Sequence, residues 1–358
     1  MEYLLIPIAL LMAFGNGAND NFKGFATVWG SGTLSYRHAL LLASIATAAG
    51  SLLSLSLAGG LAEQFSGKGL LPQAIVAAPH FIASVGIGAA LTVIIATRAG
   101  LPISTTHALI GGLIGAGLAA SPGEVQFARL WNTFLLPLLF SPVVAALLGL
   151  VAYRLLRMRQ AEKDCACVMP LSAQLVPRAD VAMLRIAAPQ LIVAENASCD
   201  SKRPAMRFSI AQALDRLHIG SAALICFARA VNDTPKLAAL LIAARMLHAQ
   251  VSIILIAAVM AVGGLVFARR VAETMSRRVT RMDHTQGLAA NLITALLVLG
   301  ASKFGLPVST THVSVGSIAG VGAGGHAFNW PIFRNILLSW VATLPLAGCI
   351  AWIALKVL

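Results

Sequence analysis

The sequence PISTTHALIGG, from Pro102 to Gly112, returns 205 positions later as PVSTTHVSVGS, from Pro307 to Ser317. Each copy lies where one apolar run ends and another begins. Proline cannot continue a helix, whereas serine and threonine favour the position that caps the next helix. Each copy therefore predicts a break between two helices, and a break written twice indicates an internal repeat.

A second pair of motifs strengthens the repeat. FGNGANDNFK, residues 14–23, aligns with FARAVNDTPK, residues 227–236, and both place Asn-Asp inside an apolar run. A weaker match relates the segment SPVVAALLG, which begins at Ser141, to LPLAGCIAW, which begins at Leu344. Three matches in the same order predict that the chain consists of two homologous halves.

The halves are expected to be membrane repeats. The first covers residues 1–153 and the second covers residues 208–358, and a basic polar linker, residues 154–207, joins them. The linker is hydrophilic, and we expect it to be loosely structured. We also expect its cysteines to stay reduced, because the charge pattern described below places the linker in the cytoplasm.

Composition places the chain in a membrane. Of its 358 residues, 58% are hydrophobic and only 11% are charged, whereas soluble domains carry about 25% charged residues. The sequence predicts an all-α polytopic protein of the bacterial inner membrane with about ten to twelve membrane segments, since a helix crosses the bilayer core in about 20 residues. Apolar runs of sufficient length lie at residues 37–59, 78–97, 127–153, 239–267 and 331–355.

The net charge of +13 first suggests nucleic acid as a partner. The basic residues, however, gather in two loops, residues 154–207 and 269–281, and no nucleic-acid recognition motif accompanies them. Loops rich in Lys and Arg remain on the cytoplasmic side of a membrane. The charge therefore indicates membrane topology, with the lipid bilayer rather than nucleic acid as the partner.

The two halves are expected to be inverted relative to each other. The loop at residues 59–77 holds one Lys and no Arg, whereas its counterpart at residues 268–284 holds five Arg. These loops should face opposite sides of the membrane. Inverted repeats with broken helices are typical of secondary transporters, whose substrate site lies near the midplane at the repeat interface.

Asp20 and Asp233 are the two acidic residues that lie clearly within predicted membrane segments. A charge at the bilayer centre costs about 2.5–3.5 kcal/mol on insertion scales, so it requires a partner or a function. Each aspartate follows an asparagine, Asn19 or Asn232, and carboxylate with amide oxygens suits a hard cation. The pairs therefore predict cation coordination or proton exchange, with a polar clamp between helices as the alternative.

The hydroxyl residues of the two breaks are candidate anion ligands. A helix N-terminus offers unpaired N–H groups and partial positive charge, and hydroxyls add neutral donors. Two such ends that face each other would cradle an oxyanion, although capping alone also explains them. His107 and His312 follow and are expected to form local hydrogen bonds. The candidates are Ser104, Thr105, Thr106, Ser309, Thr310 and Thr311.

Together these motifs resemble the inorganic phosphate transporter family, which carries a GANDVAN-like signature and a P-x-S-T-T-H stretch in each of two inverted halves. The resemblance implies a symporter that moves phosphate by alternating access with H⁺, Na⁺ or both, and needs no cofactor. It also implies that the hydroxyl candidates hold phosphate oxygens. Coupling cations, with Na⁺ as one possible metal, and phosphate would contact Asn19, Asp20, Asn232 and Asp233.

The chain departs from the family pattern at matching positions. Lys23 and Lys236 replace the second Asn of the signature, and Arg229 stands where the family often has His. Two lysines would cancel Asp20 and Asp233, so we expect these four residues to serve the coupling ion or proton and the sodium dependence to be weak. Alternatively, each lysine forms only a local ion pair with the aspartate three residues before it.

Other functions remain as alternatives. A sulfate or related oxyanion permease of the same fold is the first of these. An intramembrane enzyme is disfavoured because hydrolysis needs an asymmetric acid, base and nucleophile, whereas the polar elements here are duplicated. A non-transporting scaffold would not need paired buried carboxylates, and saturable uptake that drives accumulation would exclude a channel. Inorganic phosphate is the expected partner, and a homodimer is compatible with the sequence.

Overall fold

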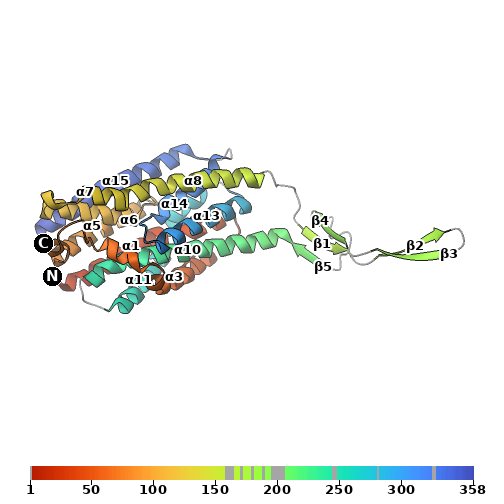
Figure 1. Cartoon of the computed structure of the whole chain (residues 1–358), viewed down its shortest axis with the longest axis horizontal. Helices are drawn as coiled ribbons and strands as arrows, with labels where there is room; N and C mark the ends of the chain where they lie inside the picture. Colours follow the sequence, from red (N-terminus) through yellow and green to blue (C-terminus); the bar gives the residue numbers. More distant parts are fainter. Residues whose placement is uncertain are drawn as a thin grey trace. The chain divides into compact units, whose positions relative to one another are not determined.

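The computed structural model describes residues 2–157, 165–169, 172–178, 181–187, 190–194, 206–243, 248–279, 282–324 and 328–358. The chain forms two compact units (Figure 1). Unit 1 comprises Met1–Arg154 together with His218–Leu358, and unit 2 comprises Leu155–Leu217. Unit 1 contains nearly all of the helical residues and carries every predicted site residue.

Unit 1 is helical, which confirms the predicted all-α fold class. The predicted ten to twelve membrane segments stay a prediction, and within the described residues the unit has ten helices of 14 residues or more. They are α1 (Glu2–Asp20), α3 (Tyr36–Phe65), α5 (Pro79–Arg98), α6 (Thr105–Ala120), α8 (Leu136–Arg157), α10 (Ile210–Ala243), α11 (Ala249–Phe267), α13 (His284–Lys303), α14 (Thr310–Ala323) and α15 (Trp330–Val357). Short turns connect them: η1 (Lys23–Phe25), α2 (Ala26–Gly30), α4 (Gln73–Val76), η2 (Pro122–Glu124), α7 (Phe127–Leu130), α12 (Arg269–Glu273) and the π-helical turns η3 (Trp131–Leu135) and η4 (Thr274–Arg278).

Several helices have the length and composition of membrane spans. Within the described residues five qualify: α5, the continuous α7–α8 segment, α11, α13 and α15. A sixth is α3 if its two parts, which meet at an angle of 76°, form one span. Large apolar side chains such as Leu147 and Val341 are more than half exposed on the outer helix faces. An outward apolar surface of this kind suits lipid, and the chain is an integral membrane protein.

The two Pro-x-Ser-Thr-Thr-His segments are hairpin tips. The first joins α5 to α6, and the second joins α13 to α14. At both tips the chain turns through a glycine with positive φ, Gly100 at 70° and Gly305 at 67°, a conformation that side chains with a Cβ rarely adopt. The predicted helix breaks are therefore present at both positions.

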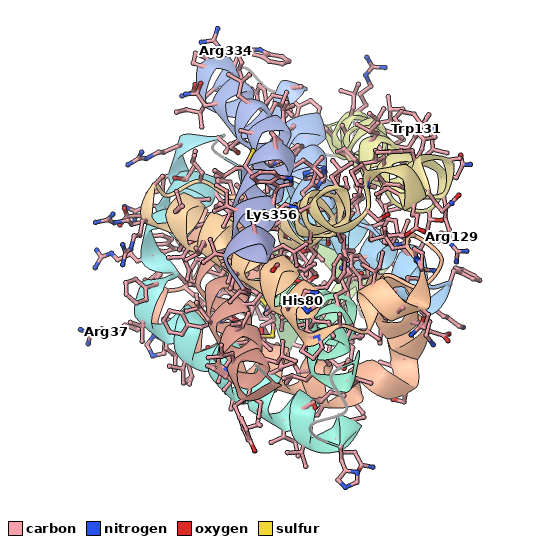
Figure 2. The ribbon with its side chains drawn as sticks, turned by 90° about the vertical axis from the view of Figure 1, so that its left-hand side faces the viewer. Arg37, His80, Arg129, Trp131, Arg334 and Lys356 are labelled. Atoms are coloured by element: carbon pink, nitrogen blue, oxygen red, sulfur yellow. The ribbon has the colours of Figure 1, made fainter. Side chains whose placement is uncertain are left out.

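The hairpins enter unit 1 from opposite ends. Lys356, close to the C-terminus at the left of Figure 1, donates to the carbonyl of Ala119 at the end of α6 (3.1 Å). His80, at the start of α5, is seen from that same side in Figure 2. Helices α13 and α14 lie toward the other end of the unit in Figure 1. The two tips consequently meet inside the unit.

Helices α1 and α11 approach closely through paired glycines. A Cβ on Gly17 would lie 1.9 Å from the Met260 carbonyl oxygen, and a Cβ on Gly263 would lie 2.2 Å from that of Phe14. Small residues let membrane helices pack backbone against backbone. Gly17 of the first motif thus serves packing, and it fixes α1 where its following Asn-Asp pair faces the interior.

This contact yields a stability prediction. The Gly17→Ala variant should lose about 1–3 kcal/mol or more, because the added methyl group has no room. Its melting temperature in detergent and its yield of monodisperse protein should both fall. Gly300→Ala is the matched control, since nothing lies within 4 Å of a Cβ there. A Gly17→Ala protein as stable as Gly300→Ala would contradict the described packing.

Unit 2 contains strands, so the expectation of a loosely structured linker is wrong for its described parts. One antiparallel sheet has the order β4 (Gln190–Ala194), β1 (Cys165–Met169), β5 (Met206–Ser209). A second pairs β2 (Ser172–Arg178) with β3 (Val181–Ala187) in antiparallel register. Branched apolar residues in these segments favour strands. Cys165 is a free thiol, whereas Cys167 is disulfide-bonded, which contradicts the expectation of reduced linker cysteines.

Candidate substrate and coupling-ion site

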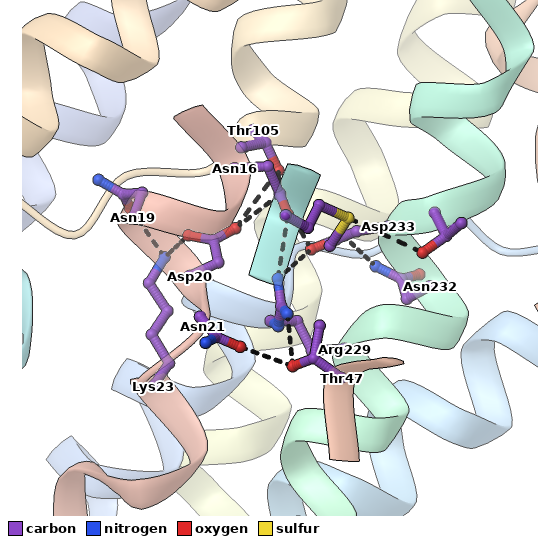
Figure 3. A network of polar contacts seen from close by, with 12 residues as sticks. Asn16, Asn19, Asp20, Asn21, Lys23, Thr47, Thr105, Arg229, Asn232 and Asp233 are labelled. Carbon is purple, nitrogen blue, oxygen red and sulfur yellow. Dashed lines mark hydrogen bonds and ion pairs between the residues drawn. The ribbon is translucent and has the colours of Figure 1, made fainter. Parts of the chain in front are cut away.

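A buried polar network lies where α1, α10 and the two hairpin tips converge (Figure 3). The Asn-Asp pair of α1, Asn19 and Asp20, is at most 1% exposed, and the pair of α10, Asn232 and Asp233, is at most 2% exposed. In α1 the pair ends the helix, and in α10 the helix continues through Pro235. The sequence repeat thus brings both predicted acidic groups into one interior network.

Asn16 joins the two aspartates. Its Nδ2 donates to Asp20 Oδ2 (3.1 Å), to Asp233 Oδ2 (3.3 Å) and to Thr105 Oγ1 (3.0 Å). The Thr105 hydroxyl also lies 3.5 Å from Asp20 Oδ2. One amide therefore couples the acidic groups of both halves to the tip of the first hairpin.

Lys23 is enclosed by oxygen atoms from both halves. Its Nζ forms an ion pair with Asp20 and donates to Asn19 Oδ1 (3.1 Å), the Ile103 carbonyl (3.0 Å) and the Thr311 hydroxyl. The local ion pair with the aspartate three residues earlier is therefore present. The ammonium group, however, also crosses to the opposite hairpin, which a purely local pair would not do.

Lys236 repeats this arrangement from the second half. Its Nζ lies 3.6 Å from Asp233 Oδ1 and donates to the Val308 carbonyl (3.0 Å) and to Thr106 Oγ1 (2.9 Å). These partners correspond to those of Lys23 at the offset of 205. Val308 matches Ile103, and Thr106 matches Thr311. Each lysine thus binds its own aspartate, a carbonyl of its own hairpin tip and a threonine of the other tip.

The hairpin tips also bond to each other directly. Thr311 Oγ1 donates to the Ile103 carbonyl (2.7 Å), and Thr106 Oγ1 lies 3.5 Å from the Val308 carbonyl. These reciprocal contacts place the two threonine-rich tips face to face. The hydroxyls of Thr106 and Thr311 therefore contact carbonyl and ammonium groups of the protein.

The predicted hydroxyl residues have different tasks. Ser104 and Ser309 accept from the backbone N–H groups of His107 (3.1 Å) and His312 (3.2 Å), so the capping interpretation holds for the serines. Thr310 is 5% exposed at the second tip. The structure brings all six hydroxyl residues to the two tips, and Thr105, Thr106 and Thr311 lie next to charged side chains.

The two histidines pack across the contact between the tips. The ring centroids of His107 and His312 lie 4.5 Å apart, and the His312 ring stacks on Trp340 at 3.8 Å. Trp340 Nε1 in turn donates to the Pro102 carbonyl (3.1 Å). The histidines and Trp340 thus form an aromatic contact that connects the two hairpins.

Arg229 adds a charge that the sequence-based count left out. Its Nη1 donates to Asn16 Oδ1 (3.0 Å) and lies 3.9 Å from Asp233 Oδ2, while its Nη2 donates to Thr47 Oγ1 (2.9 Å). The side chain is 1% exposed. Two aspartates, two lysines and Arg229 are the buried Asp, Glu, Lys and Arg residues within the described parts of the chain, so the ionised network carries a net charge of +1.

Sequence reasoning missed several members of the network. Asn16 and Arg229 meet although they are matching positions of the two repeats, at an offset of 213. Thr97 and Ser302 match at 205, and they bind Asn19 (2.9 Å) and Asn232 (3.1 Å) respectively. A search of both aligned motifs for polar residues on the same helix face would have found them.

Comparison with known proteins identifies the family. A family model described as "Phosphate transporter family" matches residues 16–351. The chain belongs to the phosphate transporter family. The match covers both hairpins and both Asn-Asp pairs, which confirms the resemblance noted in the sequence. Members of this family are transporters rather than enzymes, so the enzyme alternative is set aside.

Relatives match along nearly the whole chain. A candidate phosphate permease of Pyrococcus abyssi is 26% identical, with 99% of this chain and 97% of the relative covered. A Mycobacterium tuberculosis protein, provisionally named a low-affinity inorganic phosphate transporter, is 28% identical, with 97% and 75% covered. A solved structure described as a sodium-dependent phosphate transporter superposes with a TM-score of 0.75 at 21% identity and supports the fold. The superposition covers 99% of this chain and 98% of the chain in the solved structure.

Proposed function

We propose that the chain is a secondary active symporter that carries inorganic phosphate by alternating access, coupled to protons rather than to sodium. Family membership and the names of the relatives support phosphate as the substrate. The observation that carries the proposed coupling is the oxygen cage around the Lys23 ammonium group. The paired cage around Lys236 supports it.

The lysines stand in for coupling cations in this proposal. Carboxylate, amide, carbonyl and hydroxyl oxygens are the ligands of hard cations in proteins. Around Lys23 these four oxygen types surround a fixed ammonium of the same charge as Na⁺. The oxygens predicted for sodium on Asn19 and Asp20 are therefore already used. A transporter of this design needs no sodium to neutralise its aspartates.

The charge of the network requires at most one coupling cation for each dibasic phosphate ion. With a net charge of +1, the network is balanced by one monovalent anion. Monobasic phosphate, H₂PO₄⁻, fulfils this condition, and so does HPO₄²⁻ that arrives with one proton. Because an uncompensated charge in a low-dielectric interior is costly, the occluded complex should be most stable when neutral.

The anion is proposed to bind between the hairpin tips. The hydroxyls of Thr105, Thr106, Thr310 and Thr311 would donate to its oxygens, together with unpaired N–H groups at the starts of α6 and α14. Binding would replace the tip-to-tip contacts described above. The lysine ammonium groups lie within hydrogen-bond distance of two of these hydroxyls, so they would become direct partners of the anion.

Transport of labelled phosphate into proteoliposomes tests this function. With an inward proton gradient the purified protein should accumulate phosphate above equilibrium, in a saturable manner. Arsenate should compete about as well as unlabelled phosphate, and sulfate should compete poorly. Equilibration without accumulation would indicate a channel, and stronger competition by sulfate than by arsenate would indicate an oxyanion permease of another specificity.

A paired hydroxyl variant tests the anion site. In Thr105→Val with Thr310→Val, two donors to phosphate are replaced by methyl groups of similar size. Each lost hydrogen bond is worth about 1 kcal/mol, so the KM for phosphate should rise about tenfold or more. Thr343→Val is the control, because that hydroxyl donates to the Ser339 carbonyl of its own helix. An unchanged KM in the double variant would move the anion site elsewhere.

A further inference from the structure

Two polar cavities flank the buried network at matching places in the repeat. One, of about 610 Å³, is lined by Thr97 and Arg98 at the end of α5, together with residues of α11 and α12. The other, of about 740 Å³, is lined by Ser302 and Lys303 at the end of α13, together with residues of α3. Thr97 matches Ser302, and Arg98 matches Lys303, at the offset of 205.

We propose that these cavities are the anion-recruiting vestibules of the transport path, one for each side of the membrane, and that Thr97 and Ser302 mark their inner ends. The inference rests on the proposed phosphate transport and names the route by which the anion reaches that site. It assigns Asn19 and Asn232 a further task as the side chains that separate each vestibule from the ion pairs.

The inner end of each vestibule is one side chain away from a buried charge. In the first, Asn19 Nδ2 donates to Thr97 Oγ1 (2.9 Å), and Asn19 Oδ1 accepts from Lys23 Nζ (3.1 Å). In the second, Ser302 Oγ donates to Asn232 Oδ1 (3.1 Å), and Asn232 Nδ2 donates to Asp233 Oδ1 (3.1 Å). Rotation of a single asparagine would therefore connect a vestibule with the network.

The charge of the first vestibule suits an anion. Its described lining residues include three basic side chains and one carboxylate, Arg98, Arg269, Arg270 and Glu273. Arg269 Nε pairs with Glu273 Oε1 at 3.1 Å, and Arg270 Nη1 donates to the Arg98 carbonyl at 2.7 Å. The lining thus keeps a surplus of two positive charges.

The second vestibule has the same charge balance, and one of its basic residues, Lys303, matches Arg98 of the first. Its described lining residues again include three basic side chains and one carboxylate, Lys68, Arg129, Lys303 and Glu63. Lys68 Nζ lies 3.6 Å from Glu63 Oε1, so a surplus of two positive charges remains here too. Clefts lined by one sign of charge concentrate oppositely charged solutes. A path for cations would not be basic at both mouths.

The two vestibules belong to opposite sides of the membrane. Hairpin α5–α6 enters from the left-hand end of unit 1 in Figure 1, and α7, which carries Arg129 of the second vestibule, lies at that same end. The first vestibule lies beyond the tip of this hairpin, because it includes Arg98 at the inner end of α5 and Arg270, which contacts it. The first vestibule thus opens on the side opposite to the one from which hairpin α5–α6 enters. The second opens on the side opposite to the one from which hairpin α13–α14 enters.

Cysteine accessibility in reconstituted protein tests the assignment. Thr97→Cys and Ser302→Cys are made in a background without native cysteines and treated with membrane-impermeant methanethiosulfonates from either side. Thr97→Cys should react from one side only and Ser302→Cys from the other. At low salt the sulfonate reagent should react about tenfold faster than the trimethylammonium reagent, because basic vestibules attract anions.

Two controls localise the effect. Thr92→Cys in α5 and Thr294→Cys in α13 replace buried hydroxyls that bond to carbonyls of their own helices, and both variants should stay unlabelled. Arg270→Gln should slow sulfonate labelling of Thr97→Cys about threefold, since it removes one charge from that vestibule. The same change should leave labelling of Ser302→Cys as it was.

Clear outcomes overturn the proposal. Labelling of both positions from the same side, labelling of neither, or faster reaction with the cationic reagent would contradict it. If Thr97→Cys or Ser302→Cys does not insert, Arg98→Cys and Lys303→Cys report on the same cavities under the same criteria. Saturating phosphate should slow labelling at the inner positions. If phosphate does not slow the labelling while each position still reacts from its own side, the result would count against the proposed phosphate transport. It would still support the two vestibules.

Discussion

Replacement of Asp20 by asparagine is expected to lower phosphate accumulation about 100-fold or more, because it leaves Lys23 as a buried charge without its ion-pair partner. Asp20 accepts from Asn16 with one carboxylate oxygen and holds the lysine with the other. An asparagine side chain keeps the size but loses the charge and one acceptor. Initial rates and accumulation ratios in proteoliposomes, at equal amounts of inserted protein, measure the effect.

A charge-compensated variant separates folding from transport. Asp20→Asn combined with Lys23→Met removes both members of the pair, so insertion and melting temperature should recover toward those of the parent. Accumulation should stay low, since the cage between the tips is gone. Normal accumulation in the single variant Asp20→Asn would show that this carboxylate has no part in coupling.

Exchange of Lys23 for asparagine is expected to turn a sodium-independent transporter into a sodium-dependent one. The variant restores the residue that the family signature carries and empties the oxygen cage around Asp20. Uptake in choline medium should fall about 100-fold, because a buried carboxylate loses its partner. Sodium should recover much of it, as Na⁺ can bind the vacated oxygens of Asn19 and Asp20.

The sodium titration of this variant needs a matched lysine control. Lys356→Asn removes an exposed ammonium that donates to the Ala119 carbonyl and lies over the Trp352 ring, and it makes no hydrogen bond or ion pair with the described residues of the network. Its uptake should remain independent of sodium. If Lys23→Asn transports equally well in choline and in sodium, the lysine does not stand in for a cation and serves only as a local ion pair.

Much of the fold was predictable from local signals. The two Pro-x-Ser-Thr-Thr-His segments gave the helix breaks, because proline and glycine end helices and hydroxyl residues start them. The matching Asn-Asp pairs, such as Asn19 with Asp20, predicted a buried polar centre, because an acidic residue inside an apolar run demands a partner. These inferences need only residues that lie close together in the sequence.

The cross-links between halves were not predictable in the same way. Spacing along α1 indicated that Lys23 pairs with Asp20, but its contact with Thr311 depends on how two hairpins meet in space. Arg229 was noted only as a departure from a pattern, and its bond to Asn16 brings two matching positions together. Such contacts are tertiary, and a repeat offset shows which residues match without showing which residues touch.

The strands of unit 2 were missed for a related reason. The polar segments and positive charge of the linker predict loose structure, although it also contains short apolar runs such as QLIVA at residues 190–194. Branched and apolar residues of this kind favour strands when a partner is available. Segment β4 finds that partner in β1, which lies more than twenty residues earlier in the chain.

Replacement of sodium by choline during phosphate uptake into proteoliposomes, at a fixed inward proton gradient, tests most directly whether lysines take the place of coupling cations. The parent protein should accumulate phosphate to the same level in both media, and collapse of the proton gradient should abolish accumulation in both. Accumulation that requires sodium and persists without the proton gradient would contradict the proposed role of Lys23 and Lys236.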